Sequence, residues 1–189
     1  DQLGGARVED DRYGIADLAA GSDAQALEAM RRYLSYLPAS AAGPAPVLAC
    51  DDPAQRRDES LLTAVPGNSR RAYDMRKVIG AIVDRDSVFE IKPGYAKNLV
   101  TCFARLDGRP VGIVANQPLH IAGTLDAAAC EKGAHFVSVC DAFGLPLVYL
   151  IDLPGFMLGS GAERSGLARR SARLLFELGQ ASVTRISVV

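Results

Sequence analysis

The stretch LIDLPGFMLGSGAERSGLARR, which runs from Leu150 to Arg170, changes character twice along its length. It opens with an apolar run typical of a β-strand, breaks at Pro154-Gly155, and resumes helical spacing after a glycine-rich segment. The pattern Ser160-x-x-Glu163 matches a capping box and predicts the start of a helix. Because free amides at a helix start attract anions and glycines let a ligand approach the backbone, this unit is a candidate anion site.

The same stretch excludes one common kind of anion site. GFMLGSG lacks the Lys-Ser/Thr pair of a phosphate-binding P-loop, and the chain contains no GxGxxG. An ordinary turn between a strand and a helix also fits the pattern, so both interpretations stay open.

A second loop of this kind follows the run VGIVANQ. The strand predicted there ends in Asn116-Gln117-Pro118, a loop with Gly123 follows, and a helix begins near Leu125. The two amide side chains either orient a ligand or cap a turn. If the two strands are neighbours, both loops lie at one edge of the sheet, which favours a shared pocket over two unrelated turns.

The order of the expected elements predicts a layered α/β core. Two β-rich runs meet at Asp107-Gly108, a strong hairpin signal. A helix over about 126–143, the buried strand PLVYLID, a helix after Glu163 and a further buried strand, ISVV, follow. This β-β-α-β-α-β order implies parallel crossovers, with ligands beyond the carboxyl ends of the strands. The side chains expected to face inward from the 126–143 helix are Ala129, Phe136, Cys140 and Phe143, with Gly144 as its stop.

Two helices are predicted before this core. Ser22-x-x-Gln25 starts one over about 22–37, and Asp74 caps the other. Their apolar residues at helical spacing are Leu27, Met30, Leu34 and Leu37, and Met75, Val78, Ile79 and Ile82. The stretch between the helices is rich in Pro, Gly and Ala without sustained periodicity, and it is the best candidate for a domain boundary.

Composition bounds the class of protein. The 189 residues carry a net charge of -1 and are 49% hydrophobic, so nothing indicates a general nucleic-acid partner. No apolar run is long enough to span a bilayer, no secretion signal is visible, and the 4 cysteines form no CxxC. We therefore expect a cytoplasmic protein with reduced, mostly buried thiols. The start at Asp1 without Met and the end on RISVV lead us to expect missing sequence at both ends.

Titratable residues indicate no nucleophilic or metal chemistry. No Ser-His-Asp or Cys-His arrangement follows from the spacing. We expect His135 to be a structural histidine near the buried side of its helix, and His120, in the loop after Pro118, to be the better site candidate. The arginines expected to form a solvated face on the last helix are Arg164, Arg169, Arg170 and Arg173.

Four segments occur in the order of a known family, and the similarity extends over nearly the whole chain: LGGARVEDDRYGIADLAAGSDAQALEAMRRYLSYLP, YDMRKVIGAIVDRDSVFEI, NLVTCFARLDGRPVGIVANQP and AGTLDAAACEKGAHFVSVCDAFGLPLVYLIDLPGF. Together they resemble the carboxyltransferase (beta) subunit of biotin-dependent acyl-CoA carboxylases of the acetyl-/propionyl-CoA carboxylase type. The resemblance implies an α/β crotonase-like ββα superhelix. It places the end of a first carboxyltransferase domain in residues 1–70 and the start of a second in residues 71–189.

The resemblance also implies a reaction and partners. A carboxyl group passes from carboxybiotin, held on a biotin carrier protein, to the α-carbon of an acyl-CoA such as acetyl- or propionyl-CoA. The implied partners are a biotin carboxylase or biotin carrier subunit and further copies of the chain in a hexamer-type ring of dimers. No metal, nucleic acid or membrane is implied.

The pocket residues implied by the resemblance come from the two loops. We expect the backbone amides of Gly155 and Phe156 to stabilise negative charge, and Asn116 and Glu163 to position a ligand with their side chains. The other implied pocket residues are Gln117, Pro118, Gly123, Asp152, Pro154, Gly159 and Gly166. The paired glycines of the family's oxyanion holes are expected outside these residues.

Departures from the family pattern leave several alternatives open. Phe156-Met157-Leu158-Gly159 stands where many members have PGFxPG, Ala162-Glu163 where many have Gln-Glu, and Glu9-Asp10-Asp11 where a His is common. These departures leave the acyl specificity open. The alternatives are a subunit of a biotin-dependent decarboxylase, a biotin-independent crotonase-type hydratase or decarboxylase using Glu163 or Asp152, and a non-catalytic scaffold.

Overall fold

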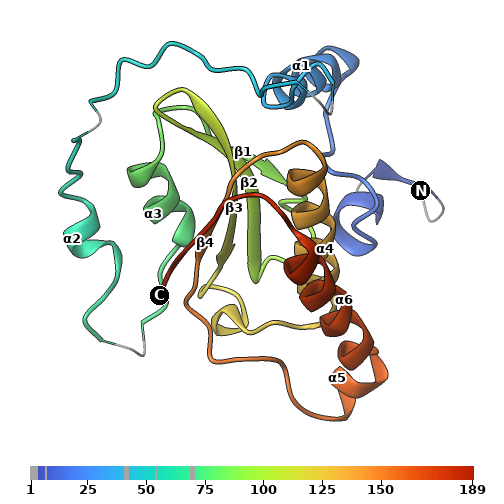
Figure 1. Cartoon of the computed structure of the whole chain (residues 1–189). Coiled ribbons are helices and arrows are strands. Elements are labelled where there is room, and N and C mark those ends of the chain that lie inside the picture. The colour runs from blue at the N-terminus through green and yellow to red at the C-terminus, as the bar shows by residue number, and fades with distance from the viewer. Residues whose placement is uncertain (1–3, 7, 41–42, 54, 69–70) are drawn as a thin grey trace.

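One mixed sheet organises the chain. The computed structural model describes residues 4–6, 8–40, 43–53, 55–68 and 71–189. Within them the sheet has the strand order β1-β2-β3-β4-β5 (Figure 1). The strands are β1 (Phe89–Ile91), β2 (Leu99–Leu106), β3 (Arg109–Asn116), β4 (Leu147–Leu150) and β5 (Arg185–Val188). β1, β2 and β3 pair antiparallel, whereas β3, β4 and β5 pair parallel, as the predicted hairpin and crossovers require.

The hairpin between β2 and β3 confirms the Asp107-Gly108 prediction. Asp107 has a φ of 53° and Gly108 a φ of 74°, the two positive values of a type I′ turn. Gly108 also packs closely, because a Cβ there would lie 1.8 Å from the Leu48 carbonyl oxygen. The turn is held by Asp84, whose carboxylate accepts hydrogen bonds from both turn amides at 3.0 and 2.7 Å.

Helices cover both faces of the sheet. α4 and α6 lie against one face and α3 against the other (Figure 1). The helical elements are the π-helix η1 (Val8–Arg12), α1 (Asp23–Leu34), α2 (Leu61–Ala64), α3 (Met75–Ile82), the 3-10 helix η2 (Ile121–Gly123), α4 (Ala127–Ala142), α5 (Ser160–Arg164) and α6 (Leu167–Gln180). None of the helices among these described residues is long and apolar enough to cross a membrane.

The two predicted N-terminal caps form, as does the predicted stop at Gly144, and Asp126 caps a third helix. Ser22 accepts the Gln25 amide at the start of α1, and Asp74 accepts the Arg76 amide at the start of α3. Asp126 accepts the Ala129 amide at the start of α4, and Gly144 follows the end of that helix with a φ of 67°. Side-chain acceptors satisfy amides that no helix can pair internally, so these boundaries follow from local sequence.

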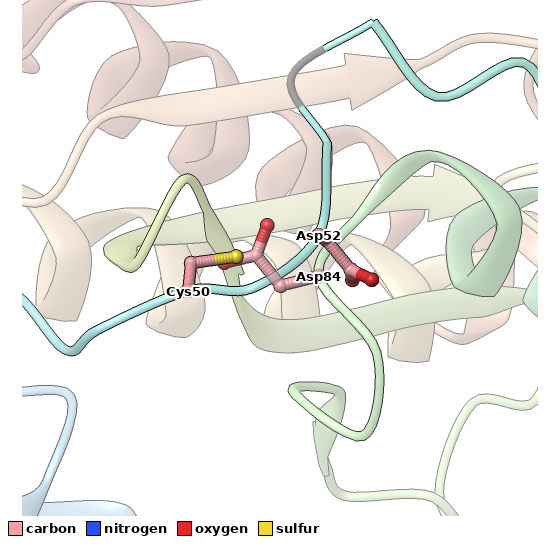
Figure 2. Close-up of side chains that lie close together, drawn as sticks. All are labelled: Cys50, Asp52 and Asp84. Atoms are coloured by element: carbon pink, nitrogen blue, oxygen red, sulfur yellow. The ribbon is translucent and has the colours of Figure 1, made fainter.

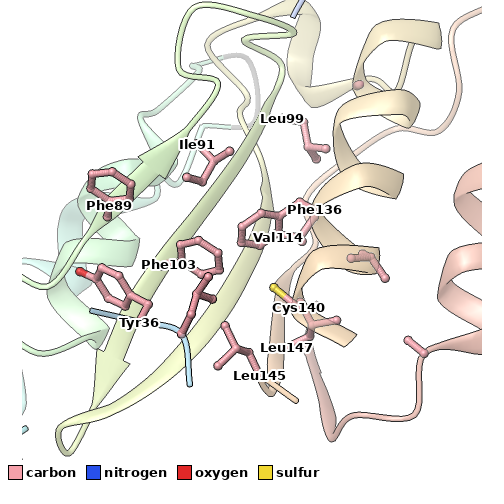
Figure 3. Packing of buried hydrophobic residues seen from close by; sticks show 14 residues of the cluster. Tyr36, Phe89, Ile91, Leu99, Phe103, Val114, Phe136, Cys140, Leu145 and Leu147 are labelled. Atoms are coloured by element: carbon pink, nitrogen blue, oxygen red, sulfur yellow. The ribbon is translucent and has the colours of Figure 1, made fainter. Parts of the chain in front are cut away.

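The main core lies between the sheet and α4. Phe103 of β2 and Leu147 of β4 pack with Phe136 and Cys140 of α4, and all four are at most 2% exposed (Figure 3). Ala129 is buried as predicted, and Phe143 is half-buried against the same cluster. A second cluster holds Met75 and Ile79 of α3 against the other face of β2 and β3. Alternate strand residues therefore face the two helical layers.

The N-terminal part joins this core through the rings of Tyr33 and Tyr36, which both contact Phe89 and Phe103. The Tyr36 ring stacks on Phe103 with centroids 5.5 Å apart, and Leu37 is buried beside it. The three residues of the predicted apolar series that lie in α1 are exposed, with Leu27 at 52%, Met30 at 57% and Leu34 at 63%, whereas Ala29 and Tyr33 pack against the core. α1 ends at Leu34, before the predicted end of the helix at 37. Leu37 is therefore outside the helix, and it is the one residue of the predicted apolar series that is buried.

Three expectations about the C-terminal part were wrong. Ser160 does not cap a helix: Gly159, with a φ of 103°, is the N-cap residue of α5, and it makes no side-chain bond. The single helix predicted after Glu163 is divided, because Gly166 adopts a left-handed φ of 72° between α5 and α6. ISVV is not buried, since all four residues of β5 are exposed and no described helix covers them. One residue of α3 also differs from the apolar pattern predicted for that helix. Ile82 is 38% exposed, because it is the last residue of α3.

The strand PLVYLID is shorter and less buried than predicted. β4 spans Leu147–Leu150, with its two ends buried and Val148 and Tyr149 half-buried. Its neighbour β5 is exposed, so β4 is only partly shielded on the side away from β3.

Candidate functional site

The two loops singled out in the sequence meet at the carboxyl edge of the sheet. β3 and β4 are parallel neighbours with Ala115 opposite Leu150, so the loops that follow them begin side by side. The Leu125 amide donates to the Gly155 carbonyl at 3.0 Å, and the Met157 amide donates to the Leu125 carbonyl at 2.8 Å. These bonds form an isolated parallel bridge between Leu125 and Phe156. The predicted convergence of the loops is therefore confirmed.

Asn116 ties the two loops together. Its Nδ2 donates to the Gly123 carbonyl at 3.1 Å, and its Oδ1 accepts the Asp152 amide at 3.3 Å. A Cβ on Gly123 would lie 2.8 Å from the Asp152 carbonyl oxygen, so the loops pack too closely for a side chain there. Asn116 is 4% exposed. It acts on the backbone of the site and does not face solvent.

Gln117 joins the same edge to the start of α3. Its Oε1 accepts the Met75 amide at 3.2 Å, and its Nε2 donates to Asp74 Oδ1 at 2.6 Å. The side chain is fully buried, with 0% exposed. Both ends of the amide are occupied by protein partners, so Gln117 holds a helix rather than a ligand. Pro118 follows it and is half-buried.

The backbone after β4 offers two unpaired donors. Gly155 has a φ of 134°, a conformation that other residues rarely adopt. Within the described residues, the N–H groups of Gly155 and Phe156 have no hydrogen-bond acceptor, although the Gly155 carbonyl is paired. Phe156 is 43% exposed. Two consecutive donors therefore stand at an accessible position between the two loops.

The other predicted site residues are placed less tightly. Asp152 is exposed, and its Oδ2 accepts the Tyr73 hydroxyl at 2.7 Å. Pro154 and Gly159 are exposed along the loop. Glu163 lies exposed on α5, where its carboxylate has no partner among the described residues, and Gly166 follows at the break before α6. The structure thus joins Asn116, Gly123, Asp152, Gly155 and Phe156, whereas it shows no contact from Glu163 or Gly166 to them.

Sequence reasoning missed Tyr73. It belongs to the stretch interpreted as the end of the connector, yet its hydroxyl contacts Asp152, which is 79 residues further along the chain. Burial, followed by the bond to Asp152, raises the pKa of Tyr73, so the phenol keeps its proton and remains a donor. The one sequence feature that could have pointed to Tyr73 is its position directly before Asp74, the residue predicted to cap a helix.

The remaining ionisable candidates contribute little to this edge. His135 is exposed, so the prediction that it lies near the buried side of its helix was wrong: its side chain is on the outer face of α4, although its neighbours Ala134 and Phe136 are buried. His120 is exposed in the loop as expected. Arg173 pairs with Glu131 of α4 at 2.8 Å, and Arg170 lies 3.9 Å from the same carboxylate. These arginines join α6 to α4.

Three of the cysteines are buried as predicted, and the fourth lies in an acidic cluster. Cys50, Asp52 and Asp84 come together at the hairpin end of β3, away from the loop edge (Figure 2). Asp84 holds the hairpin amides, and Asp52 pairs with Arg56 at 2.9 Å and accepts the Arg85 amide at 2.7 Å. Both carboxylates already serve the fold, so the cluster is explained by local structure.

Known proteins resemble this arrangement over its full length. A family model described as carboxyl transferase domain matches residues 1–189. The mitochondrial propionyl-CoA carboxylase beta chain of Sus scrofa is 46% identical over 189 residues, which are 100% of this chain and 35% of that protein. The methylmalonyl-CoA decarboxylase subunit alpha of Veillonella parvula is 41% identical, over 100% of this chain and 37% of that protein.

The chain belongs to the carboxyl transferase domain family. A transcarboxylase 12S structure, described as a hexamer assembly with methylmalonyl-coenzyme A bound, superposes with a TM-score of 0.96 at 41% identity over 100% of this chain and 37% of that one. A single-chain, multi-domain long-chain acyl-CoA carboxylase superposes with a TM-score of 0.85 at 35% identity over 98% and 18%. The predicted family and α/β fold class are confirmed. This carboxyltransferase chain spans little more than a third of the curated relatives that it matches.

Proposed function

We propose that this chain is part of a carboxyltransferase that moves a carboxyl group from carboxybiotin, on a carrier protein, to the α-carbon of an acyl-CoA such as acetyl- or propionyl-CoA. The observation that carries the proposal is the pair of amides at Gly155 and Phe156, which have no acceptor in the described part of the chain and lie where two loops join. The identity to propionyl-CoA carboxylase beta chains supports the choice of reaction.

The amides suit a reaction in which an oxygen gains charge. Bound carboxybiotin supplies the carboxyl group, and its ureido oxygen gains negative charge as the carboxyl leaves. The Gly155 and Phe156 N–H groups are donors that would face this oxygen without first having to release another acceptor. Loss of one such donor typically costs about 3 kcal/mol of transition-state stabilisation. Asn116 keeps the loop backbones in register, so the donors are held in place before the substrate arrives.

The wider assignment is part of the same proposal. We assign residues 1–70 to the end of a first carboxyltransferase domain and residues 71–189 to the start of a second. The partners are a biotin carboxylase or biotin carrier subunit and further copies of the chain in a hexamer-type ring of dimers, and the compartment is the cytoplasm. The hexamer assembly of the transcarboxylase 12S structure supports oligomerisation, whereas the propionyl-CoA carboxylase beta chain of Sus scrofa is mitochondrial.

The direct test supplies free carboxybiotin or carboxylated carrier to the full chain with acetyl- or propionyl-CoA, and follows the malonyl-type CoA ester. Gly155→Ala should lower kcat about a hundredfold, because a side chain at a φ of 134° is strained and the two amides must turn. Gly161→Ala is the matched control, since Gly161 has open space around it and no positive φ. Absence of transfer with any acyl-CoA would contradict the proposal.

A biotin-dependent decarboxylase is the second candidate, favoured by the 41% identity to the Veillonella parvula decarboxylase subunit. It uses the same site with the transfer running from a malonyl-type CoA ester to biotin. The same assay, started from methylmalonyl-CoA and biotin, separates the two by the direction that proceeds faster with the natural carrier.

A further inference from the structure

The N-terminal end of α3 holds both loops of the proposed site. Tyr73 donates its hydroxyl to Asp152 Oδ2 at 2.7 Å. Asp74 accepts Gln117 Nε2 at 2.6 Å, and the Met75 amide donates to Gln117 Oε1 at 3.2 Å. Three consecutive residues therefore contact the first residues of the loops that follow β3 and β4.

The contact from Tyr73 holds the Asp152 carboxylate, whereas the contacts from Asp74 and Met75 hold Gln117. The backbone of Asp152 is held only in part by its amide bond to Asn116, which is long at 3.3 Å, and by its close approach to Gly123, so the contact from Tyr73 to its carboxylate adds a further restraint. Among the described residues, the carboxylate of Asp152 has Tyr73 as its sole hydrogen-bond or ion-pair partner. Asp152 is exposed, so without Tyr73 its side chain would be free to take other rotamers in water.

The position of Asp152 makes this contact relevant to the proposed chemistry. Asp152 opens the segment that turns at Gly155 and presents the amides of Gly155 and Phe156. Beyond Phe156 the segment is fixed again, by the bonds between Leu125 and the backbone of Gly155 and Met157. A rigid start and a rigid end determine the direction of the two amides between them, and small errors of direction in a catalytic group lower rates strongly.

Burial keeps the Tyr73 hydroxyl protonated. Tyr73 is half-buried, and its desolvation, followed by the bond to the Asp152 carboxylate, raises its pKa. The hydroxyl therefore keeps the proton that it donates to Asp152 Oδ2.

We propose that Tyr73 is a positioning residue for carboxyl transfer, acting through Asp152 on the direction of the Gly155 and Phe156 amides. This inference rests on the proposed function of those amides. It adds a residue outside the two loops, directly before the N-cap of α3, the helix that covers the opposite face of the sheet from α4.

The test uses Tyr73→Phe in the full chain, assayed with carboxylated carrier and acyl-CoA. We expect kcat to fall about tenfold, with the KM for acyl-CoA and the thermal midpoint unchanged, since only one hydroxyl is removed. Tyr149→Phe is the matched control, because the Tyr149 hydroxyl is buried with no hydrogen-bond partner among the residues that the structure describes. That control should keep the wild-type kcat.

A double-mutant cycle tests whether Tyr73 acts through Asp152. Tyr73→Phe added to Asp152→Ala should slow the reaction no further than Asp152→Ala alone, whereas independent effects would multiply. A multiplied effect, or a wild-type kcat in Tyr73→Phe, would overturn the inference. If the fall in kcat came with a lower thermal midpoint, Tyr73 would have a merely structural role. That result would also overturn the inference.

Hydrogen exchange separates this inference from the proposed function. The amides of Leu125 and Met157 are protected by the bonds that close the loops, and their exchange reports loop opening without any substrate. We expect at least about fivefold faster exchange of both amides in Tyr73→Phe. If wild-type protein transfers no carboxyl group but the exchange accelerates, the proposed function fails and the positioning contact stands. Unchanged exchange would overturn the contact's role whatever the activity.

Discussion

Gly112 on β3 faces α4 at a place where the core leaves no room for a side chain. A Cβ there would lie 2.4 Å from Cys140 Sγ, 3.0 Å from Leu147 Cδ2 and 3.1 Å from Phe136 Cε1. These neighbours are between 0% and 2% exposed, so none can turn into solvent. Overpacking a core by a methyl group costs about 1–3 kcal/mol. We expect Gly112→Ala to lower the free energy of unfolding by about 2 kcal/mol, measured by urea-induced unfolding followed by circular dichroism.

The tightest contact identifies the compensating change. Cys140→Ala removes the sulfur atom and by itself leaves a small cavity, at a cost of about 1–2 kcal/mol. In Gly112→Ala/Cys140→Ala the new methyl group occupies part of that space, so the double variant should be about 1–2 kcal/mol more stable than the sum of the single effects predicts. Gly80→Ala, in α3 with open space around it, should instead stabilise by about 0.5–1 kcal/mol. Strict additivity, or a wild-type stability for Gly112→Ala, would refute the packing argument.

Three further predictions concern polar groups that hold the fold. Asp126→Ala removes the cap of α4 and an acceptor for Asn98, and should cost about 1–2 kcal/mol in the same urea experiment; an unchanged midpoint would contradict the cap. Arg105→Lys should lower the free energy of unfolding by about 2 kcal/mol, because the buried guanidinium donates to three separate carbonyl groups and an ammonium group cannot reach all of them. Equal stability of the two proteins would show that the three hydrogen bonds of the guanidinium are dispensable. Burial lowers the pKa of Lys132 to about 8, below the usual value of about 10.4, so the unfolded chain binds more protons between these pH values. The free energy of unfolding should therefore rise with pH in this window, by up to about 1.4 kcal/mol per pH unit relative to Lys132→Met, and parallel pH profiles for the two proteins would contradict the assignment.

Much of the fold was predictable from local sequence. The hairpin turn at Asp107-Gly108 and the caps at Ser22 and Asp74 formed as predicted, because each depends on residues that are neighbours in the chain. The capping box at Ser160 failed, since the neighbouring Gly159 adopts a positive φ that starts the helix one residue earlier. Where two adjacent residues can both begin a helix, pattern alone does not decide between them.

The candidate site was predictable in its loops but not in its contacts. The strand-end positions of Asn116 and Gly155 were visible in the sequence, as was the expectation that their loops would meet. The roles of the amide side chains were not visible. Asn116 and Gln117 looked like ligand-facing groups, yet both are buried and bonded to the protein backbone or to Asp74. Burial depends on what the rest of the chain brings to that edge.

By itself, the sequence determined the family, the α/β alternation, the hairpin and the two glycine-containing loops of this carboxyltransferase chain, because periodicity and turn chemistry act over a few residues. Only the tertiary structure decided that Tyr73 contacts Asp152, that Asn116 joins the loops, and that no described residue accepts a hydrogen bond from the amides of Gly155 and Phe156. These features depend on which segments lie side by side after the sheet has formed. Hydrogen bonds between distant residues leave no periodic trace in the sequence, so the structure is needed to find them.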